Sequence, residues 1–237
     1  MSLTPSTNER AESALRILEQ WPGYGPIAQV ISTHPAMDFH VAGGVVRDSH
    51  LGLNGPPKDF DLFLRGDPVD SIVEELSHHG EITSGPFGAP IWSPAAAPQT
   101  RCDLIWIHRF YNGLWPCENI GDALNQFDCT ANAIAIDLRD GSTVDPQNGR
   151  RDIRRRILRA VRFDFPDEPI SATSRLTRNA VIWWRLIHYA ASRRLTIEPV
   201  TRRWLREHRA YERCRDAFEA EIFPIDREHA DPILDIL

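Results

Sequence analysis

Two aspartates, Asp59 and Asp61, stand one residue apart in a run whose other residues favour a β-strand. Because alternate side chains of a strand point to the same face, both carboxylates project together while Phe60 points to the opposite face. Two carboxylates this close repel each other unless one is protonated or a cation neutralises them, and oxygen ligands suit Mg²⁺. The pattern therefore predicts a metal-binding pair. The alternative for an isolated pair of this spacing is a solvated strand face or loop.

A glycine pair, Gly43 and Gly44, stands shortly before these aspartates and opens a run, 45–51, that favours a helix. A glycine turn that opens a helix presents free backbone N–H groups and the positive end of the helix dipole, which together bind phosphate. Its proximity to the two carboxylates counts against the alternative of a solvated strand face. The two features together predict a nucleotide that is handled with metal ions.

A third aspartate, Asp103, lies in the predicted strand 102–108, which is otherwise apolar. It shares its predicted face with Ile105 and Ile107, and an acid on an apolar face is costly unless it is paired or bound to a metal. We therefore expect Asp103 to be a third carboxylate beside the first two. The alternative is an acid at the end of a strand, where the side chain meets solvent.

The composition is that of a globular protein, with 237 residues of which 42% are hydrophobic and 25% are charged. No apolar run approaches the roughly 18 residues that a membrane span requires, and the first ten residues lack a signal-peptide pattern. We therefore expect a cytoplasmic protein without a membrane partner. The four cysteines show no C-x-x-C spacing, which argues against a zinc site and against a disulfide framework.

The net charge of −6 conceals a strong asymmetry. Residues 150–213 contain 17 arginines and seven acidic residues, a local charge of +10, so the remainder of the chain carries −16. A basic segment on an acidic protein favours a polyanionic partner such as RNA. Because Lys58 is the only lysine, codon composition is an alternative explanation for the choice of arginine, but it does not explain the clustering.

The predicted elements alternate irregularly before residue 150 and are mainly helical after it. This order predicts an α+β fold with a mixed sheet and flanking helices, because regular βαβ repetition is absent. The predicted strands are 39–42, 60–64, 81–83, 89–93 and 102–108, and the predicted helices are 27–32, 44–51 and 69–78.

The segments around these residues resemble the tRNA nucleotidyltransferase and poly(A) polymerase family, the class II members of the DNA polymerase β-like nucleotidyltransferase superfamily. Residues 41–48 followed by 58–62 look like its head signature. Residues 127–133, Phe-Asp-Cys-Thr-Ala-Asn-Ala, are similar to its D-F-T-x-N-A motif, and residues 145–161 resemble its D-P-x-x-G-x-x-D-L…L-R-A-V element. Residues 189–199 resemble the end of its neck helix. Several motifs in the same order are more specific than any one of them.

The resemblance implies a nucleotidyltransferase head over residues 1–149 and a small, basic, all-α neck over residues 150–237. It implies transfer of a nucleoside monophosphate from a nucleoside triphosphate to an acceptor hydroxyl, at an RNA 3′ end, with release of pyrophosphate. Asp59 and Asp61, with Asp103, would hold two Mg²⁺ ions. The residues implied to bind the nucleotide are Gly43, Gly44, Arg47, Asp48, Lys58, Asp128, Asn132 and Arg159.

Two departures from the family pattern leave the base and the acceptor open. Asn125 and Gln126 replace an arginine pair, and residues 178–182 replace the E-D-x-x-R element that reads the incoming base. One alternative is therefore a catalytically inactive module that binds nucleotide or RNA, and another is nucleotidylation of a non-RNA acceptor, as in a toxin-like system. An ion pair between Arg47 and Asp48 on the helix surface is the structural alternative for those two residues.

Overall fold

A computed structural model describes residues 15–53, 55, 57, 59–67, 69–85, 88–110 and 114–237. The chain divides into two compact units. The sheet unit contains Met1–Tyr111, Pro116–Leu124 and Ile134–Pro146, and the helical unit contains Asn112–Trp115, Asn125–Ala133 and Gln147–Leu237. The boundary predicted between residues 149 and 150 stays a prediction. By its contacts, segment 125–133 packs with the helical unit.

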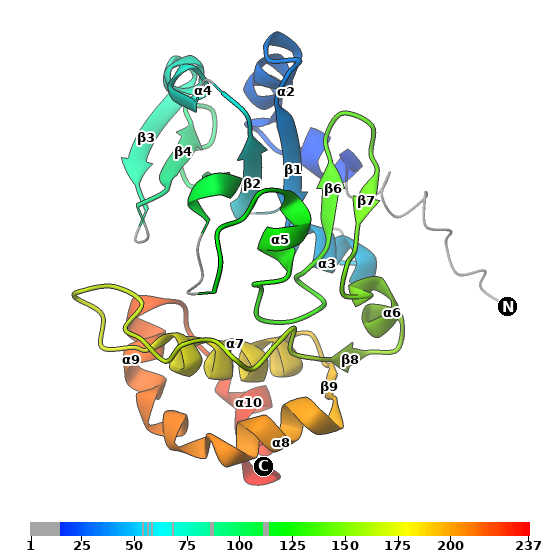
Figure 1. Cartoon of the computed structure of the whole chain (residues 1–237), viewed down its shortest axis with the longest axis vertical. Coiled ribbons are helices and arrows are strands. Elements are labelled where there is room, and N and C mark those ends of the chain that lie inside the picture. The colour runs from blue at the N-terminus through cyan, green and yellow to red at the C-terminus, as the bar shows by residue number, and fades with distance from the viewer. Residues whose placement is uncertain are drawn as a thin grey trace, which may run out of the picture. The chain divides into compact units, whose positions relative to one another are not determined.

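The sheet unit is built on a seven-stranded mixed sheet with the order β3-β4-β5-β2-β1-β6-β7 (Figure 1). Its central strands β2 and β5 are parallel, and the other neighbouring pairs are antiparallel. In β2 the successive residues Leu62, Phe63 and Leu64 are all buried, as expected of a strand covered on both faces. The strands are β1 (Asp38–Ala42), β2 (Asp59–Arg65), β3 (Gly80–Ser84), β4 (Pro90–Pro94), β5 (Arg101–Trp106), β6 (Ala135–Asp137) and β7 (Thr143–Val144).

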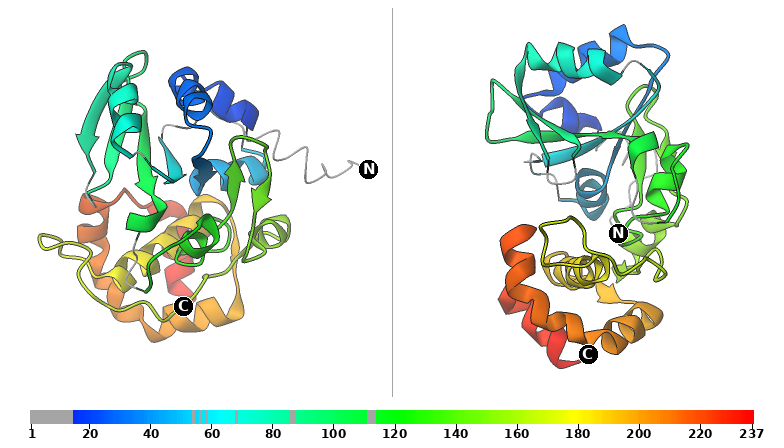
Figure 2. Two further views of the ribbon diagram at one scale, coloured as in Figure 1. Left: turned by 45° about the horizontal axis from the view of Figure 1, so that its top comes forward. Right: turned by 60° about the vertical axis from the view of Figure 1, so that its left-hand side comes forward.

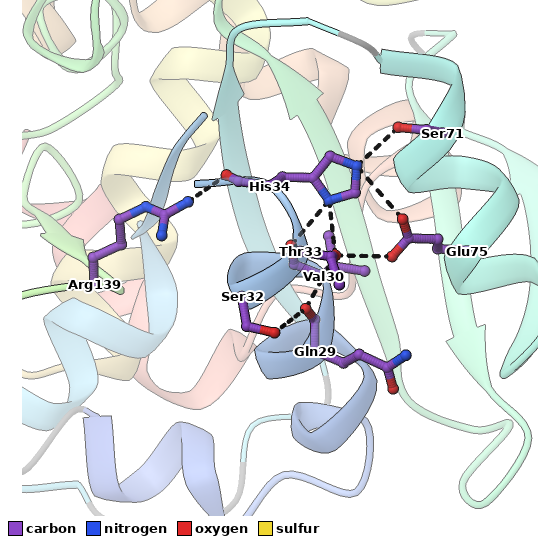
Figure 3. A network of polar contacts seen from close by, with 8 residues as sticks. All are labelled: Gln29, Val30, Ser32, Thr33, His34, Ser71, Glu75 and Arg139. Atoms are coloured by element: carbon purple, nitrogen blue, oxygen red, sulfur yellow. Dashed lines mark hydrogen bonds and ion pairs between the residues drawn. The ribbon is translucent and has the colours of Figure 1, made fainter. Parts of the chain in front are cut away.

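The helices of the sheet unit are joined partly by polar contacts. The α-helices whose bounds lie within the described residues are α2 (Tyr24–Thr33), α3 (Gly44–Leu51), α4 (Val69–Ser77) and α5 (Ile120–Leu124). The strand predicted at 102–108 ends earlier, at Trp106, and the 3-10 helix η1 (Ile107–Arg109) follows it. Figure 3 shows the link from the end of α2 to α4, where His34 Nε2 lies 2.9 Å from Ser71 Oγ and 3.5 Å from Glu75 Oε1. Because the serine and the carboxylate meet the same ring nitrogen, this cluster is not a nucleophilic triad. It fastens two helices.

The helical unit is organised around the helix α7 (Arg178–Ser192). Its tryptophans are buried, and their indole N–H groups donate to backbone carbonyls, Trp183 to Leu205 and Trp184 to Tyr211, each over 2.9 Å. Trp183 and Trp184 are therefore core residues of the helical unit. The helices α8 (Pro199–Glu207), α9 (Arg215–Glu221) and α10 (Arg227–Asp235) curve around α7 (Figure 1 and Figure 2). The remaining elements are α6 (Gly149–Arg154), the 3-10 helix η2 (Arg209–Cys214) and the parallel pair β8 (Ile157–Leu158) and β9 (Thr196–Ile197).

The predicted α+β fold, with a mixed sheet followed by helices, is confirmed. To the predicted helical part the structure adds the short ladder β8–β9. None of the helices in the part of the chain that the structure describes is long and apolar enough to cross a membrane.

Candidate active site

The glycine turn joins β1 to α3 and needs glycine for two reasons. Gly43 is the N-cap of α3 and has φ 76° and ψ −132°, a conformation that side chains strongly disfavour. A Cβ atom at Gly43 would also lie only 2.9 Å from Oδ2 of Asp61. The turn therefore brings the start of α3 against the Asp61 carboxylate.

The pairing of β2 with β5 determines which acidic side chains are neighbours. In this parallel pair Asp61 is the register partner of Asp103, and Asp59 is the register partner of Arg101. Residues in register on adjacent strands point to the same face, and residues two apart on one strand do so too. All four side chains thus belong to one face of the sheet, with Asp61 and Asp103 directly opposed.

Asp103 has the most unusual environment of these carboxylates. Its Oδ1 atom is buried and has no hydrogen-bond partner among the described residues. Burial raises the pKa of Asp103 above its ordinary value, Arg101 opposes this rise, and Asp59 adds to it. A buried carboxylate oxygen without a donor, opposite a second carboxylate, is the arrangement that a bound cation would relieve.

Asp59 is engaged differently, because its carboxylate forms an ion pair with Arg101. Arg101 Nε lies 3.0 Å from Oδ1, and its terminal nitrogen lies 3.4 Å from Oδ2. Both side chains are about half exposed. No group of three or more His, Cys, Asp or Glu side chains is positioned to hold a metal ion within the described ranges. The structure thus places Asp61 beside Asp103 and pairs Asp59 with Arg101.

The remaining residues predicted near the glycine turn differ in their surroundings. Arg47 Nε donates to Asp48 Oδ1 over 2.7 Å, so the ion pair considered as the structural alternative is present, but Arg47 is buried and not on the helix surface. A Cβ atom at Gly44 would lie 3.7 Å from a terminal nitrogen of Arg47, so this guanidinium lies beside the glycine turn. Lys58 lies outside the described residues.

Asp128 and Asn132 lie in the helical unit and form a buried cluster. Oδ1 of Asp128 accepts from the Asn132 side chain over 2.9 Å and from the Cys129 N–H over 2.6 Å. Its Oδ2 accepts from Arg185 Nε over 2.5 Å. Burial alone would raise the pKa of Asp128, but the charge and hydrogen bonds of Arg185, with those of Asn132 and Cys129, hold it below its ordinary value. Sequence reasoning missed Arg185, since nothing distinguishes it from the other arginines of the basic segment.

Arg159 also lies in the helical unit and is bound by internal partners. Its Nε donates to Asp152 Oδ2 over 2.9 Å, and its terminal nitrogen donates to the carbonyl of Gln147 over 2.6 Å. The same Asp152 oxygen accepts from the Thr130 hydroxyl over 2.7 Å. The Asp152 carboxylate therefore joins two separate segments of the helical unit.

The chain is similar in sequence to curated multifunctional CCA proteins and CCA-adding enzymes. A multifunctional CCA protein of Hahella chejuensis is 33% identical over 136 residues, which cover 56% of this chain and 32% of the relative. A CCA-adding enzyme of Francisella tularensis is 30% identical over 140 residues, which cover 56% of this chain and 37% of the relative. The chain thus spans about a third of the length of these relatives. No family model matches it.

Solved structures of CCA-adding enzymes share the fold. The Thermotoga maritima CCA-adding enzyme complexed with tRNA aligns with a TM-score of 0.66 and 19% identity, over 93% of this chain and 53% of that one. A CCA-adding enzyme without ligand aligns with a TM-score of 0.64 and 20% identity, over 94% and 49%. The resemblance of this chain to class II tRNA nucleotidyltransferases, over their head and neck, is therefore confirmed.

Proposed function

We propose that the protein is a Mg²⁺-dependent nucleotidyltransferase that moves a nucleoside monophosphate from a nucleoside triphosphate to the 3′ hydroxyl of an RNA. The observation that carries the proposal is the pair Asp61 and Asp103, opposed across β2 and β5 behind the Gly43 turn. The Francisella tularensis relative is a CCA-adding enzyme, and solved neighbours are complexes with ATP, CTP or tRNA. Cytoplasmic location remains part of the proposal.

The residues of the sheet unit fit a divalent cation. Asp61 and Asp103 would hold it, since Asp103 Oδ1 is buried without a donor in the described part of the chain and carboxylate oxygens are the ligands that Mg²⁺ prefers. Asp59 would join them once its carboxylate is released from Arg101. Bound Mg²⁺ supplies charge neutralisation for the triphosphate and lowers the pKa of the acceptor hydroxyl.

The other residues of the sheet unit would bind and orient the nucleotide. Backbone N–H groups at the start of α3 would donate to the triphosphate oxygens, and the Arg47 guanidinium lies beside them. The acceptor hydroxyl would lose its proton to solvent as its oxygen forms a bond to the α-phosphorus and the bond to pyrophosphate breaks, a step that depends on alignment and charge rather than on a protein nucleophile. Asp128, Asn132 and Arg159 remain proposed nucleotide-binding residues of the helical unit.

Incorporation of labelled nucleotide into RNA tests the proposal. The protein is incubated with each α-³²P-labelled nucleoside triphosphate, Mg²⁺ and total RNA or a tRNA transcript. We expect labelled RNA from the wild type, none from Asp61→Asn or Asp103→Asn, and normal labelling from Asp38→Asn. Asp38 is a matched control, because it lies in the same sheet and is the register partner of Arg65. Label that persists in Asp61→Asn overturns the proposal, and label on a protein or small molecule overturns the RNA acceptor.

A binding module without catalysis is the second candidate, favoured by two observations. The Asp59 carboxylate is already neutralised by Arg101, and the first turn of α7 carries no acidic residue where the family reads the base. Nucleotide binding without turnover of any of the four triphosphates, in the presence of Mg²⁺ and RNA, supports this candidate over the first.

A further inference from the structure

The β8–β9 ladder gathers arginines that are distant in the sequence. Residues 154–156 directly precede β8, and residues 193–194 shortly precede β9. Because β8 and β9 are parallel, with Ile157 paired to Thr196, both arginine runs enter the ladder from the same end. The helix α8 follows β9 (Figure 1), and its sequence contains Arg202, Arg203 and Arg206. Thr196, at the start of β9, donates its N–H to the Arg156 carbonyl over 2.8 Å and lines one pocket with the α8 arginines, so a basic cluster forms within the helical unit.

Most of these arginines have no acidic partner. The side chains of Arg154, Arg155, Arg194, Arg202 and Arg203 form no ion pair or hydrogen bond with any residue that the structure describes. Other exposed arginines of the same unit are paired, for example Arg175 with Glu221 and Arg227 with Glu219. A group of like charges without counter-charges favours a polyanionic ligand.

Two arginines at this site adopt a backbone conformation that costs energy. Arg156 has φ 55° and Arg194 has φ 51°, the left-handed region in which glycine is the usual residue. Arg156 directly precedes β8, and Arg194 stands two residues before β9. Both arginines directly follow the C-caps of α6 and α7, where a left-handed residue is usual and glycine adopts it most easily, so an arginine at both positions supports a use of that side chain.

The cluster borders a pocket of about 430 Å³ between β9 and α8. Six described residues line it, and of these three are arginines and none is acidic. Of these, Arg206 donates from Nε to the main-chain oxygen of Leu237, the last residue, over 2.6 Å. The lining residues are Thr196, Ile197, Pro199, Arg202, Arg203 and Arg206.

We infer that this cluster binds the phosphate backbone of the RNA substrate. We call it the ladder arginines and define it as Arg154, Arg155, Arg156, Arg194, Arg202, Arg203 and Arg206. The cluster extends from the starts of two strands along a helix, and such a spread suits the repeated charges of a polynucleotide better than one compact phosphate. The choice of RNA over another polyanion rests on the proposed function.

Binding measurements with the full chain test the inference. Affinity for a tRNA transcript and for an unrelated single-stranded RNA is measured by fluorescence anisotropy at several salt concentrations. We expect R202A/R203A to weaken binding of both RNAs and to reduce the slope of log affinity against log salt by about 1 to 2. The control R175A/R227A removes the same charge from paired positions and should keep the wild-type slope.

Substitution of Arg156 and Arg194 by glycine distinguishes a role of these side chains in RNA binding from a role in folding. We expect R156G and R194G to melt at the wild-type temperature or above, because glycine relieves the backbone conformation, and yet to bind RNA more weakly. If these arginines served only the fold, R156G and R194G would lower the melting temperature and leave the RNA affinity unchanged. Wild-type RNA affinity in both R202A/R203A and R194G overturns the inference, as does an equal loss in R175A/R227A.

The outcomes also separate this inference from the proposed function. If R202A/R203A loses RNA affinity while the wild type incorporates no nucleotide, the ladder site stands and the proposed function fails. If the wild type incorporates nucleotide and R202A/R203A matches it at limiting RNA, the proposed function stands and the ladder site fails. Where both hold, R202A/R203A raises KM for RNA and leaves kcat and the nucleotide KM unchanged.

Discussion

Asp61 and Asp103 face each other across the parallel strands β2 and β5 as direct register partners. Two acidic side chains opposed in this way destabilise a sheet unless a proton or a cation intervenes. Burial and the nearby Asp59 raise the pKa of Asp103 while Arg101 opposes the rise, and its buried Oδ1 atom has no hydrogen-bond partner among the described residues. The pair is thus unfavourable for the fold on its own, which is typical of a functional site.

Asp103→Asn should stabilise the metal-free protein at neutral pH. The folded-state pKa of Asp103 lies above its ordinary value of 3.8, so the folded state holds the proton more tightly than the unfolded chain. Wild-type stability should therefore fall as pH rises from about 4 through the raised pKa, and this part of the pH dependence should disappear in Asp103→Asn.

Thermal melting in EDTA and in Mg²⁺ measures both effects. Mg²⁺ should raise the melting temperature of the wild type, since a ligand that binds only the folded state stabilises it, and should raise that of Asp103→Asn much less. If Mg²⁺ raises the melting temperature of wild type and Asp103→Asn equally, Asp103 is not a metal ligand. Asp38→Asn, on the same sheet, should keep the wild-type response to Mg²⁺.

Arg101→Ala should increase the affinity of the site for Mg²⁺. The Arg101 guanidinium neutralises Asp59, so a cation that uses this carboxylate must displace it. An exposed ion pair contributes about 0.2–1 kcal/mol, so we expect a gain in affinity of about fivefold or less. Titration of the melting temperature with Mg²⁺ measures the change.

Arg65→Ala is the matched control for Arg101→Ala. Arg65 is the register partner of Asp38, and the two form an exposed ion pair with an Nε to Oδ2 distance of 2.6 Å. Both substitutions remove one arginine and leave one exposed aspartate on the same sheet. If Arg65→Ala raises Mg²⁺ affinity as much as Arg101→Ala does, the effect is a change in net charge and Asp59 has no place in the site.

The elements near the glycine turn are encoded locally, which is why they could be predicted. Gly43 and the run after it led to a helix at 44–51, the bounds that the structure has for α3. The strand predicted at 60–64 lies within β2. The strands β6 to β9 have only two or three residues, too few for a periodic pattern, and they were not predicted.

The partners of the site residues depend on pairing between distant segments. Arg101 was not predicted as the partner of Asp59, because a register between β2 and β5 decides that contact. Arg185 is 57 residues from Asp128, and no local pattern indicates their ion pair. The face of Asp103, in contrast, followed from strand alternation alone. Residue types and faces could therefore be predicted, whereas partners could not.

Gly43→Ala should destabilise the protein and abolish nucleotide transfer. A Cβ atom there meets Asp61 Oδ2 at 2.9 Å and also requires a left-handed backbone with φ 76°. We expect a loss of about 1–3 kcal/mol in unfolding free energy from the backbone alone, and displacement of the Asp61 carboxylate in addition. Urea unfolding and the incorporation assay measure the two effects.

Gly52→Ala is the control that distinguishes the backbone strain in Gly43→Ala from its contact with the Asp61 carboxylate. Gly52 ends α3 with φ 79°, and a Cβ atom there meets nothing within 4 Å. Its substitution should cost about 1 kcal/mol and leave nucleotide transfer nearly unchanged, because no carboxylate is displaced. Equal losses of activity in the two variants would show that Gly43 acts only through general stability.

Arg185→Ala should destabilise the helical unit at neutral pH and less so in acid. Removing one partner of a buried ion pair costs about 3–5 kcal/mol. Because the Arg185 side chain is 34% exposed, we expect about 2–3 kcal/mol here. In the wild type the lowered pKa of Asp128 gives stability that is present above its ordinary value of 3.8 and lost as pH falls through the lowered value.

In Arg185→Ala burial is no longer opposed by the arginine, so the pKa of Asp128 should rise and the variant should regain stability as Asp128 takes up a proton. The difference in unfolding free energy between wild type and Arg185→Ala should therefore shrink as the pH is lowered from 7 towards 4. The double variant D128N/R185A should be more stable at pH 7 than Arg185→Ala, since the neutral amide that replaces the Asp128 carboxylate leaves no buried charge and still accepts from Asn132. A difference that stays constant with pH, measured by urea unfolding, would mean that Asp128 is not the group that Arg185 keeps ionised.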